Sequence, residues 1–93
     1  MRLSKQEIKI IKKNATKIFG ECKVFLFGSR VDDSKKGGDI DLYIIAKRKE
    51  NLFVKKAKLQ VLLEDLLEKP VDVIVETNKR RLIEQEALKG IEL

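Results

Sequence analysis

The stretch that decides the fold is DIDLYIIA, residues 39–46, which is typical of a β-strand with two unlike faces. Side chains alternate between the two sides of a strand, so every second residue shares a face. One face is wholly apolar and consists of Ile40, Leu42, Ile44 and Ala46. The other begins with two carboxylates and consists of Asp39, Asp41, Tyr43 and Ile45. The pattern predicts a sheet with one packed face and one face suited to chemistry.

Two further strands are expected around this one. The run CKVFLF, residues 22–27, is too short for a helix and has apolar side chains on both parities after Lys23, as in a strand covered on both faces. The run VDVIV, residues 71–75, is apolar except for Asp72. Residues 30–38 are polar and end in two glycines, which indicates a loop with room for one helical turn at its start.

Helices are predicted before, between and after these strands. Ser4 and Glu7 have the spacing of a capping box, and Gly20 is placed to end a helix over about residues 4–19. Its inner side is marked by Ile8, Ile11, Ala15 and Ile18. A second helix is expected from a cap at Asn51 to about Lys69, before Pro70. Its inner side is marked by Leu52, Lys56, Leu59, Leu62, Leu63 and Leu66.

A last helix is expected from Thr77 or Asn78, with Ile91 near the end of its inner side. The fold class predicted from this order is α/β (α+β), a three-stranded mixed sheet packed by about four helices. Residues 1–93 form one domain in this interpretation.

Composition excludes several classes of protein. With 43% hydrophobic and 39% charged residues, the chain is too apolar to be disordered and too charged for a membrane protein. It contains no histidine, which excludes Ser-His-Asp and Cys-His catalysis and zinc-finger ligation. Cys22 is the single cysteine, so no internal disulfide can form, which fits a reducing cytoplasm. The net charge of +6 suits a polyanionic partner but is also typical of a lysine-rich solvated surface.

Carboxylates are the candidate metal ligands. Asp39 and Asp41 share a strand face and repel each other unless a cation lies between them. Asp72 interrupts an otherwise apolar strand, so its charge is expected to be balanced by a shared metal or by a basic side chain. Oxygen-only ligands favour Mg²⁺ or Mn²⁺ over zinc.

The turn after the strand 22–27 supplies candidate phosphate ligands. Gly28 allows a sharp turn and a close approach of phosphate oxygens to backbone N–H groups. The Ser29 hydroxyl can donate to those oxygens, and Arg30 can add a charged fork. Each part has an ordinary structural explanation as a turn, a solvated strand edge or an ion pair. Their combination in this order is more specific than any part.

The combination resembles the polymerase-beta-like nucleotidyltransferase superfamily, and within it the minimal nucleotidyltransferase domains of prokaryotes. The pattern of that family is a hydrophobic residue and Gly-Gly or Gly-Ser, a loop, Asp-x-Asp between hydrophobic residues, and a lone carboxylate on a later strand. These positions are Phe27-Gly28-Ser29, Asp39-Ile40-Asp41-Leu42 and Val71-Asp72-Val73. The loop is about one residue shorter than in many members, and Gly38 stands where a serine is frequent.

The resemblance implies a mechanism and a partner. Asp39 and Asp41 would hold two Mg²⁺ ions that grip the triphosphate of ATP or another NTP, while Gly28 and Ser29 orient its outer phosphates. Asp72 would bind the second metal and help to deprotonate an acceptor hydroxyl. Stand-alone members resemble antitoxins that AMPylate a tyrosine of a helical HEPN toxin. Tyr43, the sole tyrosine here, is expected to be a wall of the site or a packing residue rather than an acceptor.

Two alternatives remain from other classes of protein. The chain could neutralise a partner by binding alone, with a vestigial site; exposed apolar residues near the C-terminus, Ile91 and Leu93, are candidates for such a contact. It could also bind nucleic acid through its positive charge, which is less favoured because only 5% of its residues are aromatic. No membrane partner is expected.

Overall fold

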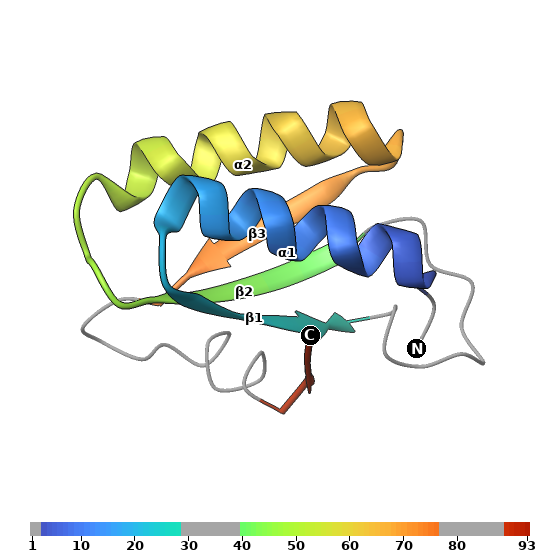
Figure 1. Cartoon of the computed structure of the whole chain (residues 1–93), viewed down its shortest axis with the longest axis horizontal. Helices are drawn as coiled ribbons and strands as arrows, with labels where there is room; N and C mark the ends of the chain where they lie inside the picture. Colours follow the sequence, from blue (N-terminus) through green and yellow to red (C-terminus); the bar gives the residue numbers. More distant parts are fainter. Residues whose placement is uncertain (1–2, 29–39, 77–88) are drawn as a thin grey trace.

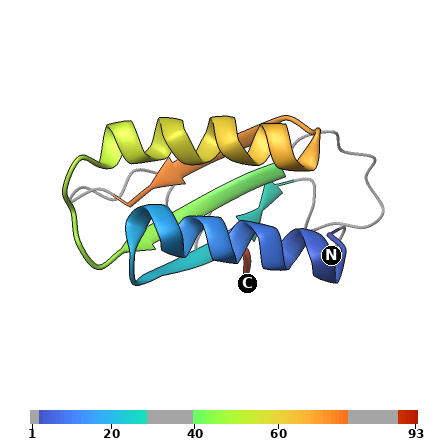
Figure 2. The ribbon, with the colours of Figure 1, turned by 45° about the horizontal axis from the view of Figure 1, so that its top comes forward.

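The computed structural model describes residues 3–28, 40–76 and 89–93. In chain order the elements are α1 (Lys5–Phe19), β1 (Cys22–Phe27), β2 (Ile40–Ala46), α2 (Leu52–Leu67), β3 (Val71–Val75) and β4 (Ile91–Glu92). The strands form one sheet in the order β3-β2-β1-β4. Both helices lie on the same face of this sheet and run in opposite directions (Figures 1 and 2). The described part of the chain is thus a two-layer α+β fold.

The sheet is mixed, as expected from the sequence. Strands β1 and β2 pair antiparallel, so that Phe27 lies opposite Asp41. Strands β2 and β3 pair parallel, and Asp41 lies opposite Asp72. This register places the beginnings of β2 and β3 beside the end of β1. Asp41, Asp72 and the turn at Gly28 therefore meet at one end of the sheet.

The first helix begins and ends as its sequence predicts. The Ser4 hydroxyl accepts a hydrogen bond from the backbone N–H of Glu7 at 3.1 Å, and the Glu7 carboxylate accepts one from the N–H of Ser4 at 3.0 Å. Gly20 ends the helix at a φ of 76°, and its N–H donates to the carbonyl of Thr16 at 2.8 Å. The capping box is confirmed.

The core lies between the helices and the apolar face of the sheet. From α1 it receives Ile11, Ala15 and Phe19, and from α2 it receives Leu59, Leu63 and Leu67. From the sheet it receives Val24, Leu26, Ile40, Leu42, Ile44, Ala46, Val71, Val73 and Val75. The alternation seen in residues 39–46 is confirmed, because all four residues of the apolar face are buried.

The sequence-based prediction was wrong in three details of the fold. Leu66 is 47% exposed, because α2 turns Leu59, Leu63 and Leu67 inward instead. Asn51 does occupy the cap position of α2, but its backbone is left-handed and its side chain makes no capping hydrogen bond.

The third correction concerns the count of elements. The described residues contain four strands and two helices rather than three strands and about four helices. Ile91, expected on a last helix, is instead in β4, where it pairs with Leu26 of β1. The remainder of that predicted helix, and the helical turn expected near Ser29, lie outside the described residues.

Membrane insertion finds no support in the two described helices, since neither combines the length and the apolar character that a span requires.

Candidate active site

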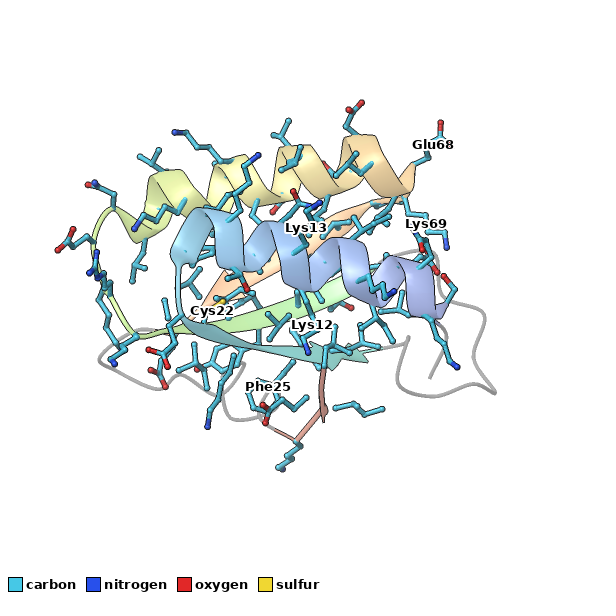
Figure 3. The ribbon with its side chains drawn as sticks, in the orientation of Figure 1. Lys12, Lys13, Cys22, Phe25, Glu68 and Lys69 are labelled. Carbon is cyan, nitrogen blue, oxygen red and sulfur yellow. The ribbon has the colours of Figure 1, made fainter. Side chains whose placement is uncertain are left out.

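The candidate site lies on the face of the sheet that points away from α1 and α2, which we call the open face because neither helix packs on it. Figure 3 shows Phe25 of β1 on this side, away from α1 and α2. Strand register arranges the face in three rows: Phe27–Asp41–Asp72, Phe25–Tyr43–Ile74, and Lys23–Ile45 with Glu76 beyond β3. Only the row at the end of β1 carries two carboxylates.

Asp41 and Asp72 are direct neighbours across β2 and β3. Aligned residues of adjacent strands lie about 4.8 Å apart at the backbone and point to the same side of the sheet. Like charges directly opposite each other destabilise a sheet, so this arrangement gains from a cation placed between them. The backbone register thus places two of the three predicted carboxylates opposite each other on neighbouring strands.

The environment of Asp72 differs from the one that its sequence suggested. An apolar strand led us to expect a buried carboxylate whose charge must be balanced, but Asp72 is exposed to solvent. The reason is that β3 lies at the edge of the sheet and its open face is turned outward at this position. Asp72 has no hydrogen-bond or ion-pair partner among the described residues. Asp41 is half-buried and does make a polar interaction.

Gly28 is fitted to the carboxylate of Asp41 in two ways. Its φ of +79° lies in the left-handed region, which strains any residue with a side chain. A Cβ atom built on Gly28 would overlap Oδ2 of Asp41 and would lie 3.1 Å from its Cγ. Only glycine allows the turn after β1 to lie directly against this carboxylate. The sequence singled out Gly28 for phosphate approach; the structure adds close contact with Asp41.

The other predicted site residues cannot be placed. Ser29, Arg30 and Asp39 lie outside the described residues, so their roles stay predictions. Over residues 3–28, 40–76 and 89–93, no three acidic or cysteine side chains form a group that could hold a metal ion. Two carboxylates do come together, and their oxygen-only chemistry fits Mg²⁺ or Mn²⁺. Asp39 would be the third ligand of such a set.

Two residues of α2 that the sequence did not single out hold β3 in place. The Glu64 carboxylate accepts a hydrogen bond from the N–H of Val71 at 3.1 Å, and the Gln60 side-chain oxygen accepts one from the N–H of Val73 at 3.4 Å. These N–H groups point outward from the edge strand and would otherwise lack a partner in the sheet. The two bonds flank Asp72 and so fix the backbone that carries it.

The C-terminal residues support the other side of the site. Strand β4 pairs with β1 through Phe25 and Leu26, just before the turn at Gly28. A Cβ atom on Gly90 would overlap the carbonyl oxygen of Leu26 and lie 3.0 Å from Cβ of Phe27. Gly90 thus permits a close approach to the strand that leads into the site. Leu93 packs against the core instead of being exposed, whereas Ile91 is 36% exposed.

An ion pair joins the elements above this end of the sheet. Lys69, in the corner between α2 and β3, donates to Oε2 of Glu7 at 2.7 Å. Burial raises the pKa of Glu7, but the hydrogen bonds from Lys69 and Ser4 and the charge of Lys69 outweigh it, so the pKa lies below its ordinary value. The Glu7 carboxylate therefore both caps α1 and binds Lys69 in the connection that leads into β3.

Tyr43 is a packing residue. It is fully buried, and its ring centroid lies 6.4 Å from that of Phe25 in a tilted arrangement. The expectation that it is not an acceptor agrees with this burial, because a buried hydroxyl cannot reach an external phosphorus atom.

Positive charge gathers at the opposite end of β2. A cavity of about 460 Å³ there is lined by Ile18, Phe19, Gly20, Glu21, Lys47, Arg48 and Lys55. Lys47 is paired with Glu21 at 3.1 Å, and both side chains are largely exposed. The carboxylate pair and this basic cavity are thus separated by the length of the strand.

Comparisons with known proteins agree with this fold. Two solved structures superimpose on nearly the whole chain. One is a re-refined structure of tri-AMPylated Shewanella oneidensis HEPN toxin in complex with MNT antitoxin, matched with a TM-score of 0.67 at 23% identity over 90% of this chain. The other is a second crystal structure from Shewanella oneidensis, with a TM-score of 0.68 at 18% identity over 97% of this chain. This chain spans 64% of the first matched chain and 71% of the second.

No curated protein matches the sequence. A family model does: the model described as "Polymerase beta, Nucleotidyltransferase" matches residues 5–93. That range includes both carboxylates of the pair, the turn at Gly28 and all six described elements. The chain therefore belongs to the polymerase-beta nucleotidyltransferase family.

Proposed function

We propose that the chain is a metal-dependent nucleotidyltransferase that transfers AMP from ATP to a tyrosine hydroxyl of a HEPN-type toxin, and so acts as its antitoxin. The observation that carries the catalytic part is the register of Asp41 and Asp72, side by side on parallel strands with Gly28 against Asp41. The partner rests on the likeness to a structure of MNT antitoxin with HEPN toxin.

Each residue of the site has a separate role in this proposal. Asp41 and Asp72, together with Asp39, would hold Mg²⁺, which when bound neutralises charge on the triphosphate and on the oxygens that enter and leave phosphorus. Gly28 leaves its backbone open to phosphate oxygens, and Ser29 and Arg30 would donate to them.

Asp72 would take the proton. Its carboxylate is exposed and stands beside Asp41, so an acceptor hydroxyl from another molecule can reach it. As the proton moves to Asp72, the hydroxyl oxygen bonds to the α-phosphorus and the bond to the β-phosphate oxygen breaks. Pyrophosphate leaves, and the acceptor carries AMP as a phosphodiester. Positioning and charge stabilisation supply the acceleration.

The test begins with the chain alone. Titration with Mn²⁺ in the presence of a non-hydrolysable ATP analogue, followed by electron paramagnetic resonance, should show ion binding in the wild type. Asp41→Asn and Asp72→Asn should each weaken it, while Glu50→Gln, a change at an exposed carboxylate in the loop before α2, should not. Equal binding by all four proteins would contradict a metal site at this pair.

The second stage adds the partner. A HEPN-type toxin is incubated with the chain, Mg²⁺ and ATP, and both proteins are weighed by intact-mass spectrometry. We expect the mass of AMP on the partner with the wild type and with Glu50→Gln, and none with Asp41→Asn. If Asp41→Asn still silences the partner without adding AMP, neutralisation is by binding alone and the enzymatic proposal fails.

A further inference from the structure

The outward side of α2 is the largest exposed apolar feature in the described part of the chain. Of the five large hydrophobic residues that are exposed there, four lie on α2: Phe53, Val54, Val61 and Leu66. Phe53 is 82% exposed and Val61 is 67% exposed. Phe53, Ala57 and Val61 follow each other at the spacing of one helical turn, and Val54 lies two turns from Val61. We call Phe53, Val54, Ala57 and Val61 the α2 stripe; Leu66 is on another side of the helix, about 140° round from Val61.

The α2 stripe is a ridge with a groove on each side. One groove is lined by Phe53, Lys56, Ala57, Gln60 and Val61, and the other by Ala57, Lys58, Val61, Leu62 and Asp65. Figure 3 shows side chains of α2 projecting away from the sheet on this side. Phe53, Val54 and Val61 are each more than half exposed, so no described element covers the stripe. A ridge between two grooves has the shape that another helix complements.

The charges of α2 indicate what that other helix is. Its basic residues Lys55, Lys56 and Lys58 lie in the amino-terminal half, and its acidic residues Glu64 and Asp65 lie in the carboxyl-terminal half, followed by Glu68 at the cap. The first turn has no acidic residue and the last turn no basic one. This order opposes the helix dipole, which favours acidic residues at the start and basic ones at the end.

Helix α1 shows that the opposite order was available. It has Glu7 in its first turn and Lys17 in its last, in agreement with the dipole. The position of Glu64 is explained by the hydrogen bond that it accepts from Val71. Lys58 and Asp65 make no such bond among the described residues. A basic-to-acidic helix is complementary to an antiparallel copy of itself.

We propose that the chain forms a two-fold symmetric homodimer through antiparallel packing of the two α2 stripes. Lys58 lies three residues before Val61, and Asp65 lies four residues after it, on the same side of the stripe. With Val61 near the symmetry axis, the axis brings Lys58 next to the partner's Asp65, and by symmetry this pair forms twice. In this register Phe53 and Val54 lie opposite the end of the partner's α2, at the edges of the contact.

The expected affinity is modest. One 16-residue helix from each protomer makes a small interface, at the low end of specific contacts. We therefore expect dissociation at low micromolar concentration rather than a permanent dimer. The open face with Asp41 and Asp72 is on the other side of the sheet from α2, so a dimer through α2 does not cover either site (Figure 1).

Sedimentation velocity over a range of concentrations tests the proposal. The wild type should pass from monomer to dimer as concentration rises, and Val61→Asp should remain monomeric, since it places two carboxylates at the axis. Far-ultraviolet circular dichroism verifies that Val61→Asp is folded. A wild type that stays monomeric at the highest concentration would overturn the proposal, as would a dimer that Val61→Asp leaves intact.

Charge reversal gives a second measurement that does not depend on the fold of Val61→Asp. Lys58→Glu and Asp65→Lys should each weaken self-association about tenfold, because each replaces two attractive pairs by two repulsive ones. A mixture of the two variants should associate one to one, since one stripe is then acidic and the other basic.

Lys13→Glu, the same charge change at an exposed position of α1, is the matched control and should leave the dimer unchanged. If the mixture associates no better than its components, antiparallel pairing of α2 is wrong.

Discussion

The two faces of the sheet are built from the same strands but differ in role: one packs against the helices, and the other carries the carboxylates of the candidate site. The helix-covered face is apolar from Val24 across Leu42 to Val73, and its residues are buried except Cys22 at the start of β1, which is partly buried. The open face changes along its length, from two carboxylates at one end through aromatic packing to a Glu76–Lys49 ion pair of 2.8 Å at the other. Period-two alternation lets one strand contribute to both. Substitutions on the helix-covered face should therefore change stability, and those at the carboxylate end of the open face should change activity.

The largest effect is expected from Asp41→Asn on the open face. Loss of this charge should reduce AMP transfer about 10³-fold, or ~4 kcal/mol of transition-state stabilisation, because the metal ions lose a ligand. The free energy of unfolding should not fall by a comparable amount, since the change also removes repulsion with Asp72. Transfer is measured by intact mass and unfolding by urea titration. A variant that loses activity only because it unfolds would contradict the division between faces.

Leu63→Ala probes the covered face. Leu63 is fully buried between α2 and the sheet, so its truncation should lower the free energy of unfolding by about 2–5 kcal/mol. Transfer by the molecules that remain folded should be nearly unchanged. Leu66→Ala, one turn further along α2 but 47% exposed, is the control and should cost under about 1 kcal/mol. Equal costs for the two variants would mean that α2 is rotated relative to the inner face seen here.

Leu66 also shows which part of the fold could be predicted from the sequence. Strong periodicity located α1, α2 and three strands, and β1 and β3 have the expected bounds. The rotation of α2 about its axis was harder to predict, because its apolar residues (Phe53, Val54 and Val61 as well as the leucines) lie almost all round the helix. Only contact with the sheet selects Leu59, Leu63 and Leu67 for burial. Strand β4 was missed because two residues carry no period of their own; they become a strand only by pairing with β1.

The sequence predicted the parts of the candidate site that depend on the alternation of side chains along a strand. It did not predict the parts that depend on which elements lie next to each other in the fold. Alternation places Asp41 on the open face, and the register of parallel strands then brings Asp72 beside it. That Asp72 is exposed follows from the edge position of β3, which no local pattern reveals. Gln60 and Glu64 act through space across the edge of the sheet, and their sequence alone marks them only as polar helix residues.

Gly28→Ala separates backbone strain from disturbance of the site. Alanine at a φ of +79° should lower the free energy of unfolding by about 1–2 kcal/mol, and its Cβ should also push the Asp41 carboxylate aside. Gly20→Ala is a matched control, because its φ is +76° but a Cβ there meets nothing within 4 Å. Both variants should lose similar stability in urea, and only Gly28→Ala should lose Mn²⁺ binding as well. Mn²⁺ binding retained by Gly28→Ala would show that the contact with Asp41 is unimportant.

The smallest effect concerns the ion pair between Glu7 and Lys69 and depends on pH. Because the pKa of Glu7 is lowered by folding, its carboxylate stabilises the folded chain above the ordinary glutamate pKa, and this stabilisation is lost as pH falls through the lowered value. Glu7→Gln keeps a capping side chain but removes the charge. It should cost about 1 kcal/mol at neutral pH and nearly nothing in acid, where the wild-type carboxyl is itself neutral. Lys69→Met should produce the same loss, and the double variant should lose no more than either alone, because all three remove one pair. If the cost of Glu7→Gln were the same at neutral and acid pH, the role of Glu7 would be helix capping alone. The connection between α2 and β3 would then be held by the hydrogen bond from Val71 to Glu64.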